Sequence, residues 1–549
     1  MAMSMHRWRL RRILGWLIPV VAYLCVLVIM TASYRASAEE RAFSSDAAYR
    51  NLVVANTLIE SRMYGPAADQ AAPMVQDMLW RVIIAGAQWV VADGVTAIFL
   101  LGMIFGVLTL LQLIRLCRVI FPYPMFSYYS AGLAVLSPGL AAAALSGLAV
   151  PVAMFLITAA VVRHLEDVTG SGPGMPLATT LFIGLALWVR LEFLVVWVLL
   201  LLHTLLVGLV PGDQRPSILN TLGRGVNGLL ILALFLLPVF AWNIRILEVP
   251  WPRLPGVPMA ADLWALEGPA AAWNQTVVLM REGWAGATEL FRATALPGVL
   301  LGRFFFWFGI LLLLIQGIRS REERPHVVLL LLMPFLVPIL FGVLYPYMGW
   351  SALPVIAASF VPVMLVITAY GVIRFPFVIE GLAGKWLPPV LLTQRAYAGW
   401  WLVAGGLLVL FSLAAQVREA RTDARMLRAH VEERHWLDSV IREEGLKRDR
   451  FLSDEPGWLV WEHGLAVIDL HAEWSPEWLT FVDLEGEYEV DRVRNHVERL
   501  NPPPGVLAVW DPVFRPLADI LPEAETLREP HDDHPERGLI VIANWPGVL

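Results

Sequence analysis

Asp46 is the residue of this chain best placed to act as a general base. It follows two serines in the stretch Phe43–Arg50 and opens a helix-like run that continues to Met63 and closes at Tyr64 and Gly65. A carboxylate just beyond a first apolar segment, at a membrane surface, is able to accept a proton from a hydroxyl there. Serine and aspartate are also favoured at helix N-termini, so a capping role for Asp46 stands beside the catalytic one.

A second candidate is the pair Arg190 and Glu192, which lies between two long apolar runs. Charged residues near membrane spans are costly, and they often serve a ligand or a transport pathway. The planar guanidinium of an arginine at this turn is suited to a phosphate headgroup. A structural ion pair that closes a tight bend is the alternative.

Tryptophans gather in the segment 247–296. They are Trp251, Trp264, Trp273 and Trp284. Aromatic rings at a membrane interface are ordinary anchors, and this is the favoured interpretation. Stacking on a sugar or a lipid is the other one.

Several common signatures are absent from the sequence. It contains no P-loop, no glycine-rich dinucleotide fingerprint and no HExxH. The eleven histidines are scattered, and Cys25 and Cys117 lie in or beside apolar runs, which supports neither a metal site nor a disulfide framework. We expect no metal cluster, no nucleic-acid partner and no ATP-driven transport by this chain alone.

Membrane helices must position these residues. Apolar residues make up 58% of the 549 residues and charged residues 16%, against about 45–50% and about 25% in soluble proteins. We expect a polytopic α-helical membrane protein with about 11–12 spans. The predicted spans are 13–30, 97–114, 126–145, 146–163, 175–191, 192–210, 226–246, 297–317, 326–345, 351–373 and 396–416. The segment 77–93 either crosses or lies at the surface.

Arginine clusters orient the spans, because basic residues concentrate on the cytoplasmic side. The clusters follow the first basic flank at Arg7–Arg12, and they are Arg115/Arg118, Arg163, Arg215/Arg224, Arg319/Arg321/Arg324 and Arg374/Lys385/Arg395. One alternation satisfies them all if 77–93 does not cross. The N-terminus is then cytoplasmic, and the loops 32–96 and 247–296 are extracytoplasmic together with the region after 417. Cleavage near Ala36–Ala38 is the alternative to an uncleaved first span.

The region 417–549 differs in charge from the membrane domain 1–416. It carries 15 basic and 28 acidic residues, a net −13, whereas residues 1–416 carry 26 basic and 19 acidic residues, a net +7. It opens with a polar helical stretch, Arg418–Arg450, where Glu432, Glu433 and Arg434 mix signs along the surface. Short apolar runs then alternate with helical or proline-rich connections, which predicts an extracytoplasmic α/β domain. Arginine supplies 39 of the 41 basic residues, typical of a GC-rich genome, and we expect a bacterial inner (plasma) membrane protein.

The arrangement resembles the GT-C superfamily of polyprenyl-phosphate-sugar-dependent glycosyltransferases. It is most similar to bacterial arabinofuranosyl- and mannosyltransferases, whose first outer loop opens with Asp-Asp-Ala-Tyr/Phe. Other similar stretches are the family's Ser-Gly-Leu-Glu-Thr-Pro turn, its Arg-Pro-Glu turn, its Gly-Arg-Tyr-x-x-Pro motif and two runs of its C-terminal domain. The matching ranges, in that order, are Ser45–Gly65, Ala144–Pro151, Trp188–Glu192, Tyr347–Pro354, His435–Leu437 and Val482–Gly486.

The chain departs from the family pattern at several of these positions. Ser45 stands in place of a first acid, Ala149 in place of glutamate and Trp350 in place of arginine, and Ala72–Trp80 differs from Gly-Tyr-Thr-Asn-Pro-Leu-Trp. Such changes are compatible with an altered substrate or with lost activity. Some relatives use a divalent metal; here no second acid next to Asp46 supports one.

The resemblance implies an inverting transfer at the outer membrane surface. Asp46 would deprotonate a hydroxyl of a glycan, lipid or protein acceptor, which attacks the anomeric carbon of the donor sugar. Arg190, and less strongly Arg62, would hold the departing phosphate. Supporting positions are Glu192, Tyr49 and Asp77. The alternatives are a non-catalytic membrane protein that binds or moves a lipid-linked glycan, and a transporter, for which we find no paired repeats.

Overall fold

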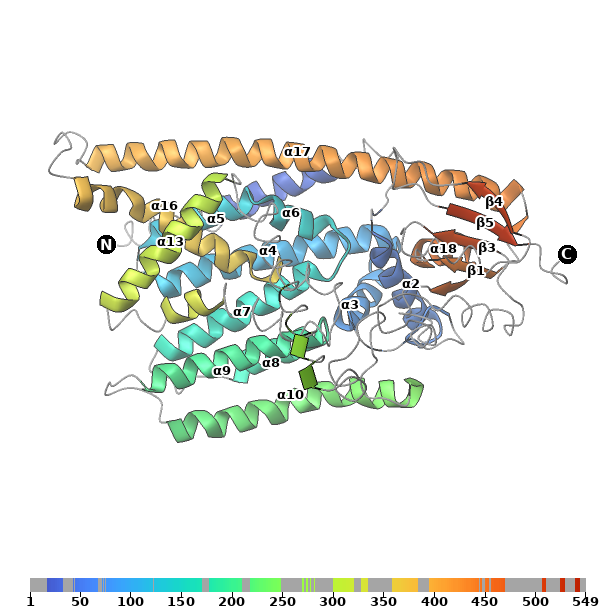
Figure 1. The fold of residues 1–549 in the computed structure, drawn as a ribbon, viewed down its shortest axis with the longest axis horizontal. Helices are drawn as coiled ribbons and strands as arrows, with labels where there is room; N and C mark the ends of the chain where they lie inside the picture. The colour runs from blue at the N-terminus through green and yellow to red at the C-terminus, as the bar shows by residue number, and fades with distance from the viewer. Residues whose placement is uncertain are drawn as a thin grey trace, which may run out of the picture.

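A bundle of long helices with a small sheet at one end makes up the described part of the chain (Figure 1). The computed structural model describes residues 17–32, 43–169 with short gaps, 177–209, 218–247, 300–319, 327–333, 358–383, 394–469 with short gaps, 506–509, 524–528 and 539–543, and single positions between 269 and 281. The helices run side by side along the longest axis, and the sheet lies beyond their ends. The predicted α-helical membrane fold with a C-terminal domain is confirmed.

Five described helices are long and apolar enough to cross a membrane. They are α4 (Gly94–Ile120), α10 (Ile218–Leu247), α13 (Leu300–Arg319), α16 (Val361–Ala383) and the first part of α17 (Gln394–Glu443). The helices α4, α10 and α17 contain the predicted spans 97–114, 226–246 and 396–416. The helices α13 and α16 only overlap the predicted spans 297–317 and 351–373, and α16 ends ten residues later than predicted. The segment 13–30 corresponds to the helix Leu17–Ala32. Most of 146–163 lies in α7 (Val150–Thr169), after a bend at 146–149, and 194–209 of the predicted span 192–210 form α9 (Leu194–Leu209). The predicted total of about 11–12 spans remains a prediction.

Two of the predicted segments differ in shape from a simple span. The segment 126–145 is a bent pair, α5 (Pro124–Val135) and α6 (Pro138–Leu145), with a change of direction of 56° at Pro138. Proline at a helix start lacks the N–H that a continuous helix needs, which explains the break. The segment 175–191 contains only α8 (Leu177–Leu187) and a turn.

The helix α3 (Met78–Gln88) occupies most of the ambiguous segment 77–93. Its 11 residues rise about 16 Å, roughly half the thickness of a hydrocarbon core. A helix of this length does not cross a bilayer by itself. The topology that places every arginine cluster on the cytoplasmic side requires that the segment 77–93 does not cross the membrane.

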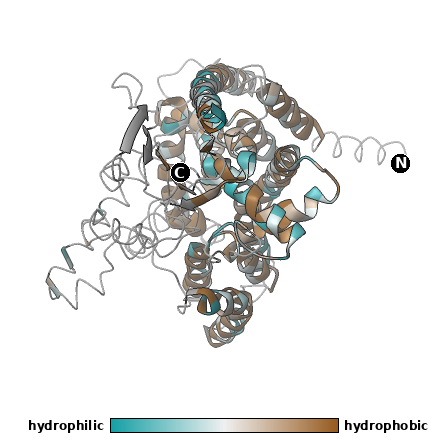
Figure 2. Cartoon of the chain, turned by 90° about the vertical axis from the view of Figure 1, so that its right-hand side faces the viewer, coloured by the Kyte–Doolittle hydropathy of each residue, from teal (hydrophilic) through white to brown (hydrophobic). Residues whose placement is uncertain are grey.

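The helix α17 joins the two parts of the molecule. It has 50 residues, which corresponds to about 75 Å. Its segment Tyr397–Ala415 is apolar, and its remainder runs toward the sheet (Figure 1). Seen from that end, hydrophilic residues appear on the nearest helices in front of a mostly hydrophobic bundle (Figure 2).

The C-terminal domain contains a five-stranded sheet in the order β2-β1-β3-β5-β4. The strands are β1 (Arg450–Ser453), β2 (Ala466–Asp469), β3 (Val506–Val509), β4 (Ala524–Arg528) and β5 (Leu539–Ala543). The pairs β1–β2 and β1–β3 are parallel, and β3–β5 and β4–β5 are antiparallel. The helix α18 (Pro456–His463) connects β1 to β2, as a parallel pair requires. The predicted α/β character is therefore confirmed.

Candidate functional site

Asp46 is the first residue of α2 (Asp46–Glu60), which lies between the bundle and the C-terminal domain (Figure 1). The N-cap of α2 is Ser45, and no side chain caps this helix. The capping role of Asp46 on its own helix is therefore wrong. Its carboxylate points to another helix.

The Asp46 carboxylate binds the N-terminus of α18 in the C-terminal domain. Oδ1 accepts a hydrogen bond from the backbone N–H of Trp458 at 2.8 Å, and Oδ2 accepts one from Gly457 at 3.2 Å. Arg50, one turn along α2, donates from Nε to Oδ2 at 2.7 Å. Asp46 and Arg50 are both buried. A carboxylate is favoured at a helix N-terminus because the backbone N–H groups there have no other partner.

Glycine 457 lets the two helices approach this closely. A Cβ at Gly457 would lie 2.6 Å from the backbone nitrogen of Arg50 and 2.8 Å from the backbone oxygen of Asp46. Real Cβ atoms essentially never come so close. Only glycine therefore fits at the contact between α18 and α2.

Arg434 of α17 completes the contact. Its Nη1 donates to the backbone oxygen of Phe43 at 3.0 Å, and its guanidinium lies 4.9 Å from the ring centre of Tyr49 and 5.4 Å from that of Trp458. Tyr49 in turn accepts from the backbone N–H of Phe43 at 3.1 Å. Arg434 is only 4% exposed, so its expected place on a mixed-charge surface is wrong. Cation–π contacts and a carbonyl replace its water shell.

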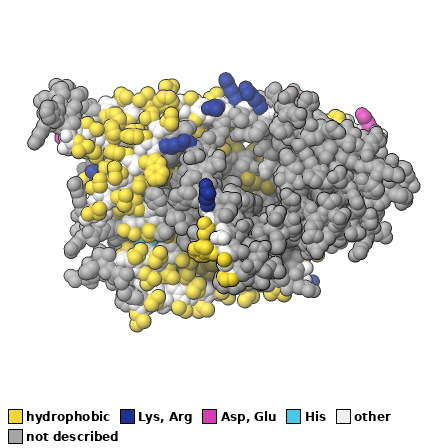
Figure 3. Space-filling view, viewed as in Figure 1, with side chains coloured by type: hydrophobic (Ala, Val, Ile, Leu, Met, Phe, Trp, Pro, Cys, Tyr) yellow, Lys and Arg dark blue, Asp and Glu magenta, His cyan; other side chains and the backbone are white. Residues whose placement is uncertain are grey.

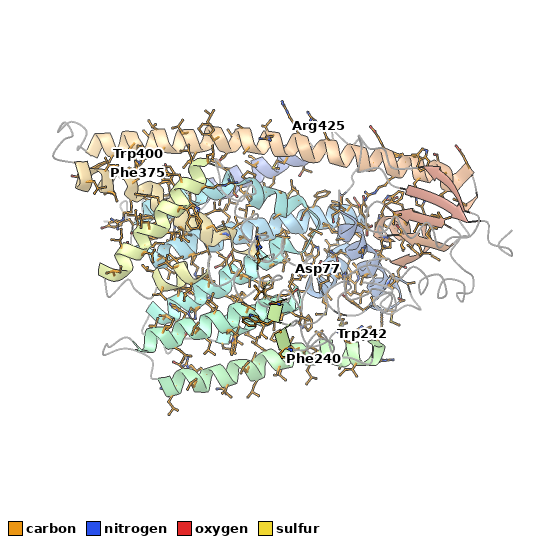
Figure 4. The ribbon with its side chains drawn as sticks, in the orientation of Figure 1. Asp77, Phe240, Trp242, Phe375, Trp400 and Arg425 are labelled. Carbon is orange, nitrogen blue, oxygen red and sulfur yellow. The ribbon has the colours of Figure 1, made fainter. Side chains whose placement is uncertain are left out.

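Asp77, Arg190 and Glu192 form a second cluster, called here the Arg190 turn. Backbone hydrogen bonds join the two segments: Asp77 N–H donates to Val189 at 2.8 Å, and Gln76 forms an isolated β-bridge with Arg190. Arg190 Nε lies 3.9 Å from Asp77 Oδ1. Figure 4 shows Asp77 where α3 meets the bundle.

Arg190 keeps part of its donor capacity unused. It is 7% exposed, and its Nε makes no hydrogen bond with any described residue. Glu192 is also buried, in the 3-10 turn Leu191–Phe193 that joins α8 to α9. A buried arginine with an unpaired N–H is suited to an anionic ligand.

The helix α3 connects the two clusters. Arg81 donates to Asn51 of α2 at 2.8 Å and to the hydroxyl of Tyr64 at 2.7 Å. Trp80 donates to the backbone oxygen of Gly147 at 2.9 Å. Gly147 has φ +77, and a Cβ there would lie 2.7 Å from Cβ of Ala48 in α2. The stretches around Asp46, Gly147 and Arg190, far apart in sequence, are thus assembled at one end of the bundle.

The other expected site residues are placed less centrally. Arg62 is exposed in the turn after α2, in a left-handed conformation with φ 58. It is 16 residues from Asp46, which corresponds to about 24 Å along a helix. The stretches 347–354 and 482–486 lie outside the described residues, as do Trp251, Trp264 and Trp284. Trp273 is described and exposed.

Several residues of the site were not predicted from the sequence. They are Arg50, Asn51, Arg81, Gly457 and Trp458. Arg50 had a local signal, since it follows Asp46 by four residues and charged pairs at this spacing face each other. Gly457 and Trp458 had none, because their partner Asp46 is more than 400 residues away.

The donor set of the site does not fit a divalent metal. Among the described residues, no group of three or more His, Cys, Asp or Glu side chains could hold one. The oxygens of Asp46 already accept three hydrogen bonds, and the nearest charged partner is a cation.

Comparison of the chain with known proteins reveals its fold but no sequence family. No family model and no curated protein sequence matches it. Among solved structures, it is similar to ArnT from Cupriavidus metallidurans in the apo state, with 11% identity, a TM-score of 0.52 and coverage of 94% of this chain and 97% of that one. ArnT bound to undecaprenyl phosphate gives 13% identity, a TM-score of 0.50 and coverage of 96% and 98%.

A third similar structure is the archaeal oligosaccharyltransferase AglB from Archaeoglobus fulgidus, in complex with an inhibitory peptide and a dolichol-phosphate. It gives 12% identity, a TM-score of 0.50 and coverage of 89% of this chain and 69% of that one. Both are GT-C membrane glycosyltransferases. The chain has the GT-C fold over almost its whole length.

Proposed function

We propose that this GT-C-fold protein transfers a sugar from a polyprenyl-phosphate donor to an acceptor hydroxyl on the extracytoplasmic side of the membrane. One observation carries the proposal. The helix α2, the backbone around Gly147 and the cluster of Asp77, Arg190 and Glu192 meet at one end of the bundle. The similar structure of ArnT was determined with undecaprenyl phosphate, the lipid part of such a donor.

Asp46 serves as the general base in this reaction. A carboxylate has about four lone-pair positions on its two oxygens. Three of them accept hydrogen bonds from Arg50, Gly457 and Trp458, two at Oδ2 and one at Oδ1. No described residue donates to the remaining position on Oδ1, which in this proposal accepts the acceptor hydroxyl. These hydrogen bonds also fix the orientation of the carboxylate, which a proton acceptor requires.

The chemical step is a single displacement with inversion. The proton of the acceptor hydroxyl moves to Asp46 Oδ1, and the acceptor oxygen forms a bond to the anomeric carbon. The bond from that carbon to the phosphate oxygen breaks, and its electron pair leaves with the polyprenyl phosphate. Arg190 stabilises the charge that develops on the phosphate through its unused N–H.

The remaining site residues support these two. Tyr49 holds the segment before α2 and shares Arg434 with Trp458. Asp77 lies 3.9 Å from Arg190 Nε, and Glu192 interacts electrostatically with Arg190. Arg62 is the weaker candidate for the phosphate, because it lies at the far end of α2.

A second candidate function is the binding or movement of a lipid-linked glycan without catalysis. One observation favours it: most of the hydrogen-bonding capacity of Asp46 serves the contact between α2 and α18. A carboxylate with a purely structural role would show the same contacts. Turnover of the donor separates the two functions.

The variant Asp46→Asn tests the proposed base. The amide oxygen still accepts from the backbone of α18, so the fold should persist, but the amide does not take a proton. Loss of a general base typically lowers a rate by about 10²–10⁴-fold. Transfer of a radiolabelled sugar from undecaprenyl-phosphate donors is measured in proteoliposomes, with size-exclusion profiles as the folding control. Full activity of a folded Asp46→Asn protein would remove Asp46 from the mechanism.

A further inference from the structure

One face of α17 carries an apolar stripe that continues as a basic stripe. It borders a groove of about 720 Å³. The residues along it are Leu410, Leu413, Val417, Arg418, Arg421 and Arg425. Within the apolar set and within the basic set the spacing is three or four residues, which places the members of each set on the same side of the helix. The basic set begins at the residue after Val417, about 100° further around the axis. The groove is thus apolar at one end and basic at the other.

Leu410 and Leu413 lie in the apolar, membrane-spanning segment of α17, and Val417 lies two residues beyond its end. Leu410, Leu413 and Val417 are 62%, 44% and 50% exposed, as expected for side chains that face lipid tails. The span ends at Ala415. The apolar half therefore reaches the edge of the hydrocarbon core.

The basic half lies at the depth of the lipid headgroups. Arg418 is three residues beyond Ala415, and Arg425 is ten residues beyond it, about 15 Å along the helix. The three arginines are exposed. Figure 3 shows basic side chains along α17 where the hydrophobic surface ends, and Figure 4 shows Arg425 directed away from the bundle.

Only part of this pattern follows from topology. Basic residues next to a span usually mark the cytoplasmic side, yet this end of α17 continues to the Asp46 cluster. Arg418, Arg421 and Arg425 are spaced three and four residues apart, which groups them within about 60° on one side of α17.

We propose that this face of α17 binds an anionic phospholipid of the surrounding bilayer. The phosphate lies among Arg418, Arg421 and Arg425, and an acyl chain lies along Leu410, Leu413 and Val417. Guanidinium groups bind phosphate through paired N–H donors. A soluble anion would gain nothing from the apolar half of the groove, which favours a phosphate that carries a hydrocarbon chain. The site is separate from the proposed glycosyl transfer and does not depend on it.

Binding of phosphatidylglycerol to the full-length chain tests the site. Native mass spectrometry of the detergent-purified protein measures the lipid retained during titration with palmitoyl-oleoyl-phosphatidylglycerol, with the zwitterionic phosphatidylcholine as comparison. We expect the double variant R421Q/R425Q to bind phosphatidylglycerol about 30-fold more weakly, because each basic residue at an anionic lipid surface strengthens binding about fivefold. The variant R421K/R425K keeps both charges and should retain most of the binding.

The matched control is R442Q on the same helix. Arg442 is exposed but pairs with Asp438 beyond the groove, so its loss should leave lipid binding unchanged. Equal binding by R421Q/R425Q and the wild type would overturn the proposal, and so would equal retention of phosphatidylcholine.

Two competition arms separate the sources of phosphate. Displacement of phosphatidylglycerol by millimolar inorganic phosphate would mean a site for a soluble anion. Displacement by undecaprenyl phosphate at lower concentration than phosphatidylglycerol would mean a site for the carrier lipid. Either result would overturn the assignment to a bilayer phospholipid, and resistance to both supports it.

Discussion

At the scale of single residues, Asp46 and Arg190 differ in how much of their hydrogen-bonding capacity is used by the protein. Arg50 and the α18 amides hold the Asp46 carboxylate in place, and no described residue donates to the second lone-pair position of Oδ1. Arg190, by contrast, has an Nε–H that makes no hydrogen bond with the described residues. An oriented carboxylate and a cation with an unused N–H suit the proposed reaction, which removes a proton at one point and releases an anion at another.

Arg190→Gln should weaken use of the donor. Loss of a charge-assisted hydrogen bond to phosphate is expected to raise the donor KM about tenfold or more. The KM of Arg190→Lys should lie between those of Arg190→Gln and the wild type, because lysine keeps the charge but loses the planar, bidentate donor geometry of the guanidinium. Steady-state transfer assays measure both. Arg163→Gln is the control, since Arg163 forms only a partly exposed ion pair with Glu166. An unchanged KM in Arg190→Gln would exclude a phosphate contact.

At the scale of elements, the contact between α2 and α18 explains why the C-terminal domain matters to a membrane site. The N-terminus of α18 lies on the Asp46 carboxylate, Gly457 removes the side chain that would separate the helices, and Arg434 of α17 bridges both. The C-terminal domain therefore helps to orient the proposed base.

Gly457→Ala should disrupt this contact. A methyl group would lie 2.6 Å from the backbone nitrogen of Arg50, and overpacking of this kind costs about 1–3 kcal/mol. We expect a lower unfolding temperature and faster proteolysis after α17. Gly406→Ala in α17 is the matched control, because nothing lies within 4 Å of a Cβ there. Equal behaviour of the two variants would contradict the tight contact.

Local patterns predicted the elements better than they predicted the contacts. Apolar runs predicted the long helices because hydropathy is a property of neighbouring residues, and α4 and α10 contain the spans expected there, whereas α16 ends ten residues beyond its predicted span. The partners of Asp46 depend on a fold that brings residue 457 to residue 46, and no local pattern encodes that. The surface position predicted for Arg434 is wrong for a related reason. Among acids in a polar helix this arginine resembles a surface residue, and only its tertiary packing against Tyr49 and Trp458 buries it.

At the scale of the whole molecule, both candidate clusters lie at the end of the bundle that carries the C-terminal domain (Figure 1). The net charges of +7 before residue 417 and −13 after it are consistent with that end facing away from the cytoplasm. Sidedness is testable without any knowledge of the substrate.

Thiol labelling should place residue 442 outside and residue 318 inside. In a chain with Cys25 and Cys117 replaced by serine, Arg442→Cys at the exposed surface of α17 should react with a membrane-impermeant maleimide in intact cells. Ile318→Cys, also exposed and next to the Arg319 cluster, should react only after permeabilisation. The opposite pattern would invert the topology.

The most direct test of the central claim is the stoichiometry of turnover by the wild-type protein. Proteoliposomes receive a radiolabelled undecaprenyl-phosphate sugar and a mixture of cell-envelope acceptors, and released undecaprenyl phosphate is counted against sugar transferred. We predict one undecaprenyl phosphate released for each sugar transferred, over many cycles for each protein molecule. Saturable binding of the donor with no release of undecaprenyl phosphate would contradict glycosyl transfer and leave a lipid-linked glycan carrier in its place.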